Sequence, residues 1–178
     1  GKTYALTAEM TVIADDSSAE GIAGIIGGEP SGCSETTTNV FLEAAYFDPL
    51  RTAATGRKLG VISDARYRFE RGVDPAFTQV GAEIATQMIL ELCGGAASHL
   101  VIAGKAPLKP RTYTLRATRV KTLAGLDLPL AEQRRILLDL GFGVKETPAG
   151  LECAPPSWRP DVHDETDLVE EVCRIHGL

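Results

Sequence analysis

The feature that most constrains the fold of this chain is a short segment, residues 104–110, where both helix and strand patterns stop. It holds two prolines, one glycine and two lysines in seven residues. Proline removes a backbone donor and glycine adds conformational entropy, so such a run is typical of a boundary between domains. We therefore expect two units, 1–106 and 107–178, each burying its own core.

Short strands are expected in the first unit. Residues 11–14 form a β-type run closed by a cluster of Asp and Ser, and residues 39–47 are a strong strand candidate. Between them, residues 21–32 hold five glycines, which permit positive φ and close backbone approach. The glycines do not match a nucleotide phosphate loop. A tight-walled pocket or a bulged strand pair is one interpretation, and ordinary turns are the other.

Helix boundaries are marked by local capping chemistry. Asp48-Pro49 matches an N-cap followed by the first helical residue, and Gly60 matches a stop, which predicts a helix over 49–59. An Asp-Pro pair also opens residues 74–95, where an apolar stripe at helical spacing ends in two glycines. We expect a second helix there.

The second unit has the order of a small winged domain. Alternation and helical periodicity predict a strand, two helices, a hairpin around a Pro-Ala-Gly turn and a final helix, over residues 112–116, 118–124, 130–140, 143–154 and 164–176. Two helices followed by a hairpin suggest a winged-helix-like fold. The whole chain is thus predicted to be α+β, with a mixed-sheet domain followed by a small winged-helix-like α/β domain.

Glu43 is an anomaly in an otherwise apolar run. Strand alternation places it on the same face as Phe41 and Phe47. A buried carboxylate without a partner is costly, so such a residue usually has a hydrogen-bonding function. The alternative is an internal salt bridge to one of the arginines at 66, 68 and 71.

Two basic segments leave a nucleic-acid contact open. Residues 63–75 alternate arginines with Tyr67 and Phe69, which suits either RNA binding or a ladder of ion pairs. Residues 109–135 hold seven basic and two acidic side chains, a local charge of 7 − 2 = +5 in a chain whose net charge is −6. This segment can touch a phosphate backbone or an acidic partner, or it is a solvated basic face.

Six carboxylates lie within residues 161–171. Three of them, Asp167, Glu170 and Glu171, have i, i+3 and i+4 spacing, at which like charges repel on a helix. On a helical wheel, Asp167 and Glu170 lie opposite the apolar stripe through Leu168, with Glu171 at its flank. Oxygen-only ligands suit a hard cation such as Mg²⁺. The alternative is a solvated acidic face.

The four cysteines are widely spaced and suit a reducing compartment. The sequence has no signal peptide and no apolar run of transmembrane length. These patterns predict a cytoplasmic protein that makes no membrane contact. The abrupt opening on Gly1 suggests a piece of something longer.

Five collinear blocks carry a family resemblance: GGEPSG (27–32), NVFLEAAYFDP (39–49), SDARYRFERGVDPAF (63–77), LELCGGAAS (90–98) and PSWRPDVHDETDLVEEVCRIHG (156–177). In these blocks the chain closely resembles the beta subunit of bacterial phenylalanine–tRNA ligase. The resemblance implies an editing domain over 1–106, incomplete at its N-terminus, and a small winged-helix-like domain over 107–178.

The resemblance implies a role within an α2β2 enzyme that attaches phenylalanine to its tRNA with ATP and Mg²⁺. The synthetic site lies in the alpha subunit, so this chain is expected neither to bind ATP nor to supply a catalytic residue for aminoacylation. In the family, an editing pocket hydrolyses tyrosine mistakenly attached to the tRNA. Glu43 matches the glutamate that recognises the tyrosine hydroxyl, and Gly27, Ser63 and Ala65 match positions in the pocket wall.

The resemblance also implies a Mg²⁺ site, shared with the alpha subunit, at Asp161, Asp167, Glu170 and Glu171. The implied partners are the alpha subunit, the tRNA for phenylalanine, and tyrosine or tyrosyl-tRNA in the pocket. Two other functions remain open. One is a free-standing hydrolase that edits mischarged tRNA in trans, and the other is a non-enzymatic nucleic-acid-binding module.

Overall fold

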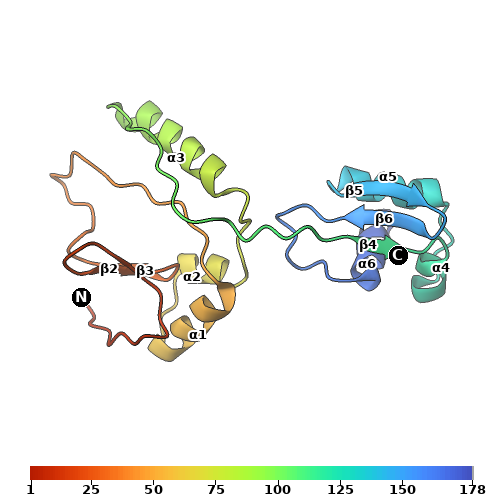
Figure 1. Cartoon of the computed structure of the whole chain (residues 1–178), viewed down its shortest axis with the longest axis horizontal. Coiled ribbons are helices and arrows are strands. Elements are labelled where there is room, and N and C mark those ends of the chain that lie inside the picture. The colour runs from red at the N-terminus through yellow and green to blue at the C-terminus, as the bar shows by residue number, and fades with distance from the viewer. Residues whose placement is uncertain (178) are drawn as a thin grey trace. The chain divides into compact units, whose positions relative to one another are not determined.

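The computed structural model describes residues 1–177, and the chain divides into two compact units, Gly1–Ala106 and Pro107–Leu178 (Figure 1). The division lies within the segment 104–110. Each unit combines helices with a small antiparallel sheet, so the predicted α+β class is confirmed. No helix in the described part of the chain is both long and apolar enough to cross a membrane.

Unit 1 contains a three-stranded antiparallel sheet in the order β1-β2-β3, formed by β1 (Val12–Ala14), β2 (Ala19–Ile22) and β3 (Ile26–Gly27). The register of β1 against β2 shifts between Ile13 and Ala14, which marks a bulge. The turn that follows β1 is held by Asp15, whose Oδ1 accepts the backbone N–H groups of Ser17 and Ser18, both at 2.7 Å. The predicted strand and turn are therefore confirmed, whereas the bulge lies between β1 and β2 and the strand pair within residues 21–32 is regular. The described sheet is antiparallel throughout rather than mixed.

The helices of unit 1 are α1 (Pro49–Leu59), α2 (Asp64–Phe69) and α3 (Thr78–Cys93). The bounds of α1 are those that the sequence predicted. The Asp48 carboxylate accepts the backbone N–H of Arg51 at 2.8 Å, and Gly60 ends the helix at φ 63°, in the left-handed region. Gly94 likewise ends α3, and its N–H donates to the Leu90 carbonyl.

One strand interpretation in unit 1 was wrong. Residues 39–47 belong to no strand of the described sheet, because no neighbouring strand supplies ladder hydrogen bonds to them. Residues 64–69 are helical, although aromatic and basic residues alternate there. The Ser63 hydroxyl starts that helix by accepting the N–H of Arg66 at 3.1 Å, which is a local capping signal.

Unit 1 buries little apolar surface of its own. Its core cluster consists of Ile22, Ile25 and Val61. The apolar stripe predicted on α3 lies on that helix, but Ile84, Met88 and Leu92 are exposed. The helix therefore contributes less burial to this unit than its periodicity predicted.

Unit 2 has the predicted element order: β4 (Tyr113–Leu115), α4 (Arg119–Ala124), α5 (Leu130–Asp139), β5 (Gly143–Thr147), β6 (Gly150–Ala154) and α6 (Glu165–His176). The hairpin β5–β6 is joined by β4 on the other edge of β6, which gives the antiparallel order β4-β6-β5 (Figure 1). Leu115 of β4 pairs with Leu151 of β6, and Tyr113 pairs with Cys153.

The core of unit 2 is larger and is centred on α6, which contacts α4, α5 and β4. Its fully buried side chains include Leu115, Ile136, Leu151, Leu168 and Val172. The predicted inward face of α6 is confirmed for Leu168 and Val172. This helix also carries the acidic residues, so the core fixes which of them face the protein.

Candidate functional site

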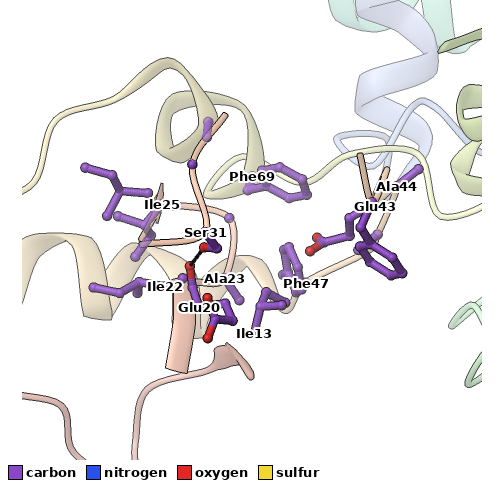
Figure 2. A pocket seen from close by; sticks show the side chains of 18 of the residues that line it. Ile13, Glu20, Ile22, Ala23, Ile25, Ser31, Glu43, Ala44, Phe47 and Phe69 are labelled. Atoms are coloured by element: carbon purple, nitrogen blue, oxygen red, sulfur yellow. Dashed lines mark hydrogen bonds between the residues drawn. The ribbon is translucent and has the colours of Figure 1, made fainter. Parts of the chain in front are cut away.

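A cavity of about 1000 Å³ lies in unit 1. Its wall combines the glycine-rich strand segment, the extended chain that precedes α1, and the faces of α2 and α3, through residues that include Ile22, Gly27, Glu43, Phe47, Ala65, Phe69 and Phe77. Figure 2 shows the labelled side chains around it, with Phe47 and Phe69 on the side nearest to Glu43. The wall is therefore mainly apolar and aromatic, which suits an organic ligand with a ring.

Glycines allow the cavity wall to close tightly. Gly24 has φ 67°, and a Cβ there would lie 3.0 Å from Phe69 and 3.1 Å from the Phe47 ring. These two rings pack with their centroids 5.2 Å apart. A side chain at position 24 would be strained and would push the rings apart. The tight-walled pocket predicted for this segment is thus confirmed.

Glu43 lines this wall but is exposed, so the burial that its apolar neighbours suggested is not found; Figure 2 shows its carboxylate directed toward Phe47 and Phe69. Partial desolvation against the wall raises the pKa of the Glu43 carboxyl above its ordinary value. Among residues 1–177, no Lys, Arg or His lies close enough to form an ion pair with Glu43. Arg66 and Arg71 pair with Glu70 instead, so the predicted alternative of an internal salt bridge was wrong.

The other predicted wall residues fall into two groups. Gly27 and Ala65 line the cavity together with Glu43. Ser63 is placed beside the wall rather than on it: its hydroxyl donates to the Ile25 carbonyl at 2.6 Å and caps α2. Ser63 thereby ties the start of α2 to the turn between β2 and β3.

The sequence analysis missed the aromatic residues of the wall. Phe69 was interpreted as part of an RNA-binding segment or ion-pair ladder and Phe77 as part of a helix stripe, yet both line the cavity. Phe69 and Phe77 lie on either side of the Asp74-Pro75 pair, and this closeness in the sequence was the available sign that both belong to one wall. It could be interpreted only once residues 64–69 were known to be helical.

The acidic segment of unit 2 is organised around Arg159. Its Nη1 and Nη2 donate to the two carboxylate oxygens of Glu171 at 2.7 and 2.9 Å, and its Nε and Nη2 donate to those of Asp161 at 2.9 and 2.6 Å. Arg174 Nη2 adds a contact to Glu171 at 2.6 Å. Hydrogen bonds from Arg159 hold the pKa values of both carboxyls below their ordinary range. The compensating positive charge therefore comes from this chain.

Glu171 was predicted at the flank of α6 but is buried, so a solvated face was the wrong interpretation for this residue. Asp167 has a capping role: its Oδ2 accepts the backbone N–H groups of His163 at 2.6 Å and Asp164 at 3.1 Å. Asp164 in turn caps α6 by accepting the N–H groups of Thr166 and Asp167, completing a capping box. Only Glu170 of the predicted ligands is exposed without one of these contacts in the described chain.

As arranged, the four predicted Mg²⁺ ligands do not fit a resident metal. Within residues 1–177, no three His, Cys, Asp or Glu side chains are grouped so that they could hold a metal ion. Asp161 and Glu171 are bound to a guanidinium, and Asp167 is bound to backbone donors. A Mg²⁺ ion would have to compete with these donors for the carboxylate oxygens.

The basic segment of unit 2 is also internally paired. Arg116 forms a bidentate pair with Glu165, with Nη2–Oε2 at 2.6 Å, and Arg135 contacts Glu132 and Asp139. Lys121 pairs with an aspartate six residues away. These contacts favour the interpretation of a solvated, ion-paired face over that of a phosphate-binding surface.

Comparison with protein families agrees with the two units. A B3/4 domain model matches residues 1–94, and a tRNA synthetase B5 domain model matches residues 113–178. The chain belongs to the B3/4 domain family, and its B3/4 domain is followed along the sequence by a B5 domain.

Among curated proteins, the chain is similar to phenylalanine–tRNA ligase beta subunits. It is 59% identical to that of Paramagnetospirillum magneticum over 99% of this chain, 57% identical to that of Cereibacter sphaeroides over 100%, and 54% identical to that of Rhodospirillum rubrum over 100%. The resemblance predicted from the sequence blocks is confirmed. The chain spans 22% of the length of each of these relatives.

Proposed function

We propose that this chain is part of the beta subunit of a phenylalanine–tRNA ligase and that its cavity edits mischarged tRNA. The substrate is tyrosine esterified to the tRNA for phenylalanine. The observation that carries the proposal is the Glu43 carboxylate, which lies on an apolar and aromatic wall with no cation paired to it. The relatives named above support this assignment to the beta subunit.

In this proposal, the tyrosine ring packs on the aromatic wall and its hydroxyl donates a hydrogen bond to Glu43. Phenylalanine has no hydroxyl, so its binding would leave a partly desolvated carboxylate unpaired. A site built to bond a hydroxyl discriminates strongly against the analogue that lacks it. This asymmetry lets the pocket reject the correct amino acid and accept the wrong one.

The reaction is the hydrolysis of an ester. A water molecule attacks the carbonyl carbon of the tyrosyl ester, and the bond between that carbon and the ribose oxygen breaks. The leaving ribose oxygen takes up a proton while the attacking water loses one, giving tyrosine and free tRNA. Glu43 positions the substrate through the distant hydroxyl, and no protein nucleophile is assigned.

The test is deacylation of tyrosyl-tRNA by the complete α2β2 enzyme carrying Glu43→Ala. Loss of one charge-assisted hydrogen bond, worth about 1.5–3 kcal/mol, predicts a fall in kcat/KM of about 10- to 150-fold. Glu83→Ala is the matched control, since Glu83 is exposed on α3 and bonds only Gln79 among the described contacts. An unchanged deacylation rate in Glu43→Ala, with aminoacylation intact, would contradict the proposal.

The whole enzyme would be cytoplasmic, with the alpha subunit and the tRNA as partners, ATP bound by the alpha subunit, and Mg²⁺ as the cofactor shared between subunits. Because Asp161 and Glu171 are paired with Arg159 in this chain, Arg159 would have to move before these carboxylates could hold that metal. No step of the editing reaction is routed through that metal. The trans-editing alternative makes a different prediction: the 178-residue chain alone would deacylate tyrosyl-tRNA at the rate of the complete enzyme.

A further inference from the structure

We propose that Arg159 is the built-in counter-ion of the acidic segment and that it excludes divalent cations from Asp161 and Glu171. A metal ion can join these two carboxylates only after the Arg159 guanidinium has left them. The inference concerns unit 2 alone and is independent of the editing proposal.

The first support is the completeness of the Arg159 contacts. All four carboxylate oxygens of Asp161 and Glu171 accept a hydrogen bond from the Arg159 guanidinium, at 2.6–2.9 Å. A planar guanidinium with five donors is suited to bridging two carboxylates in this way. Arg159 thus occupies the position between the carboxylates in which a shared cation would lie.

The second support is that Arg159 is held in place from behind. Arg111 Nη2 donates to the Arg159 carbonyl at 2.7 Å, and Arg111 Nη1 donates to the Val162 carbonyl at 2.9 Å. Val162 is itself fully buried in the core. The loop is therefore held at Arg159 itself and three residues later, which distinguishes this contact from a surface ion pair.

The third support is burial. The side chains of Arg159 and Glu171 are only 21% and 6% exposed. A buried carboxylate is strongly destabilised without a positive partner, and Arg159 is the less exposed of the two arginines bound to Glu171. Arg174 supplies a second contact to Glu171, and Asp161 has Arg159.

A bound Mg²⁺ and this guanidinium are mutually exclusive at these oxygens. Mg²⁺ requires near-octahedral oxygen ligands at about 2.0–2.1 Å, each with a lone pair directed at the metal. Arg159 N–H groups already occupy an acceptor site on each of these oxygens, and two cations within a few ångströms of each other repel. The apparent affinity for a divalent cation is therefore lowered by the free energy needed to displace Arg159.

The test uses the 178-residue chain with Mn²⁺ alone as the probe, followed by electron paramagnetic resonance. Arg159→Gln should bind at least about tenfold more tightly than the unmodified chain, because one positive charge and its hydrogen bonds are removed. Arg135→Gln is the matched control: it also removes an arginine that bridges two carboxylates, but an exposed one. It should leave the affinity at Asp161 and Glu171 unchanged. Equal or weaker binding by folded Arg159→Gln would overturn the proposal.

A second measurement does not depend on the variant folding. The Arg159 Nε–H resonance of the unmodified chain is followed by nuclear magnetic resonance during titration with Mg²⁺ alone. Under the proposal, that resonance either stays in place with no metal bound or changes in step with metal binding at the carboxylates. Saturation of Asp161 and Glu171 by Mg²⁺ with an unchanged Arg159 Nε–H signal would overturn it.

Discussion

Replacing Glu171 by alanine should destabilise unit 2 by about 3 kcal/mol. Removal of one partner from a buried ion pair costs roughly 3–5 kcal/mol. The lower end applies because Arg159 keeps its contacts to Asp161, and the Arg174 side chain is 51% exposed and can return to water. The neighbouring Glu170→Ala is the matched control, since that exposed residue should change stability by less than about 0.5 kcal/mol.

Urea unfolding followed by tryptophan fluorescence measures this difference in unit 2 alone. Trp158 is the only tryptophan of the chain and lies in that unit, where it packs against Gly141. With a urea m-value of about 1–1.5 kcal/mol/M for a unit of this size, the midpoint should fall by about 2–3 M in Glu171→Ala. Equal midpoints for the two variants would refute the buried-pair reasoning.

The difference in stability between the unmodified chain and Glu171→Ala should depend on pH with a known sign. Hydrogen bonds from Arg159 lower the pKa of folded Glu171 below its ordinary value of 4.5. Its contribution to stability is therefore fully present above pH 4.5 and is lost as the pH falls through the folded pKa. The difference between the unmodified chain and Glu171→Ala should shrink below pH 4.5, and a constant difference down to about pH 2 would contradict the assignment.

Two further predictions concern other parts of the chain. Gly24→Ala should lower the free energy of unfolding by about 1–2 kcal/mol more than Gly60→Ala does. Both glycines have positive φ, but only at Gly24 would a Cβ meet aromatic atoms. Thermal unfolding followed by circular dichroism compares the two variants, and equal losses would show that the rings move aside freely. Burial raises the pKa of the Cys153 thiol to about 11, so at about pH 8 iodoacetamide should label exposed Cys33 quickly and Cys153 only after unfolding. Mass spectrometry reports both sites, and similar labelling rates in the folded chain would contradict the burial of Cys153.

The parts of the fold that the sequence predicted well are those that local chemistry determines. The Asp48 cap and the Gly60 stop give the bounds of α1 without reference to the rest of the chain. The hairpin in unit 2 was equally accessible, because its two strands flank a short turn and pair with each other.

The parts that failed depend on distant residues. The segment 39–47 has strand-like composition, but a strand also needs a neighbour, and none pairs with it in the described chain. Glu171 was placed at a helix flank because a wheel locates residues relative to one axis only. In the structure it is buried and paired with Arg159, which lies in a loop twelve residues earlier.

The same distinction between local and distant causes applies to the candidate site. Glu43 could be singled out from the sequence because a lone carboxylate in an apolar run needs an explanation. The aromatic wall beside it could not, because Phe69 reaches the cavity only through the short helix that Ser63 caps.

The capping box at the start of α6 changes how variants of the acidic segment are to be interpreted. Asp167 accepts the backbone N–H groups of His163 and Asp164, just before the first turn, so truncating its side chain weakens the start of α6 whatever the metal does. A genetic screen that scores growth or enzyme abundance would rank Asp167 as essential for reasons of folding. Asp167→Asn, which keeps an oxygen acceptor while removing the charge, separates a folding phenotype from a ligand phenotype in such a screen.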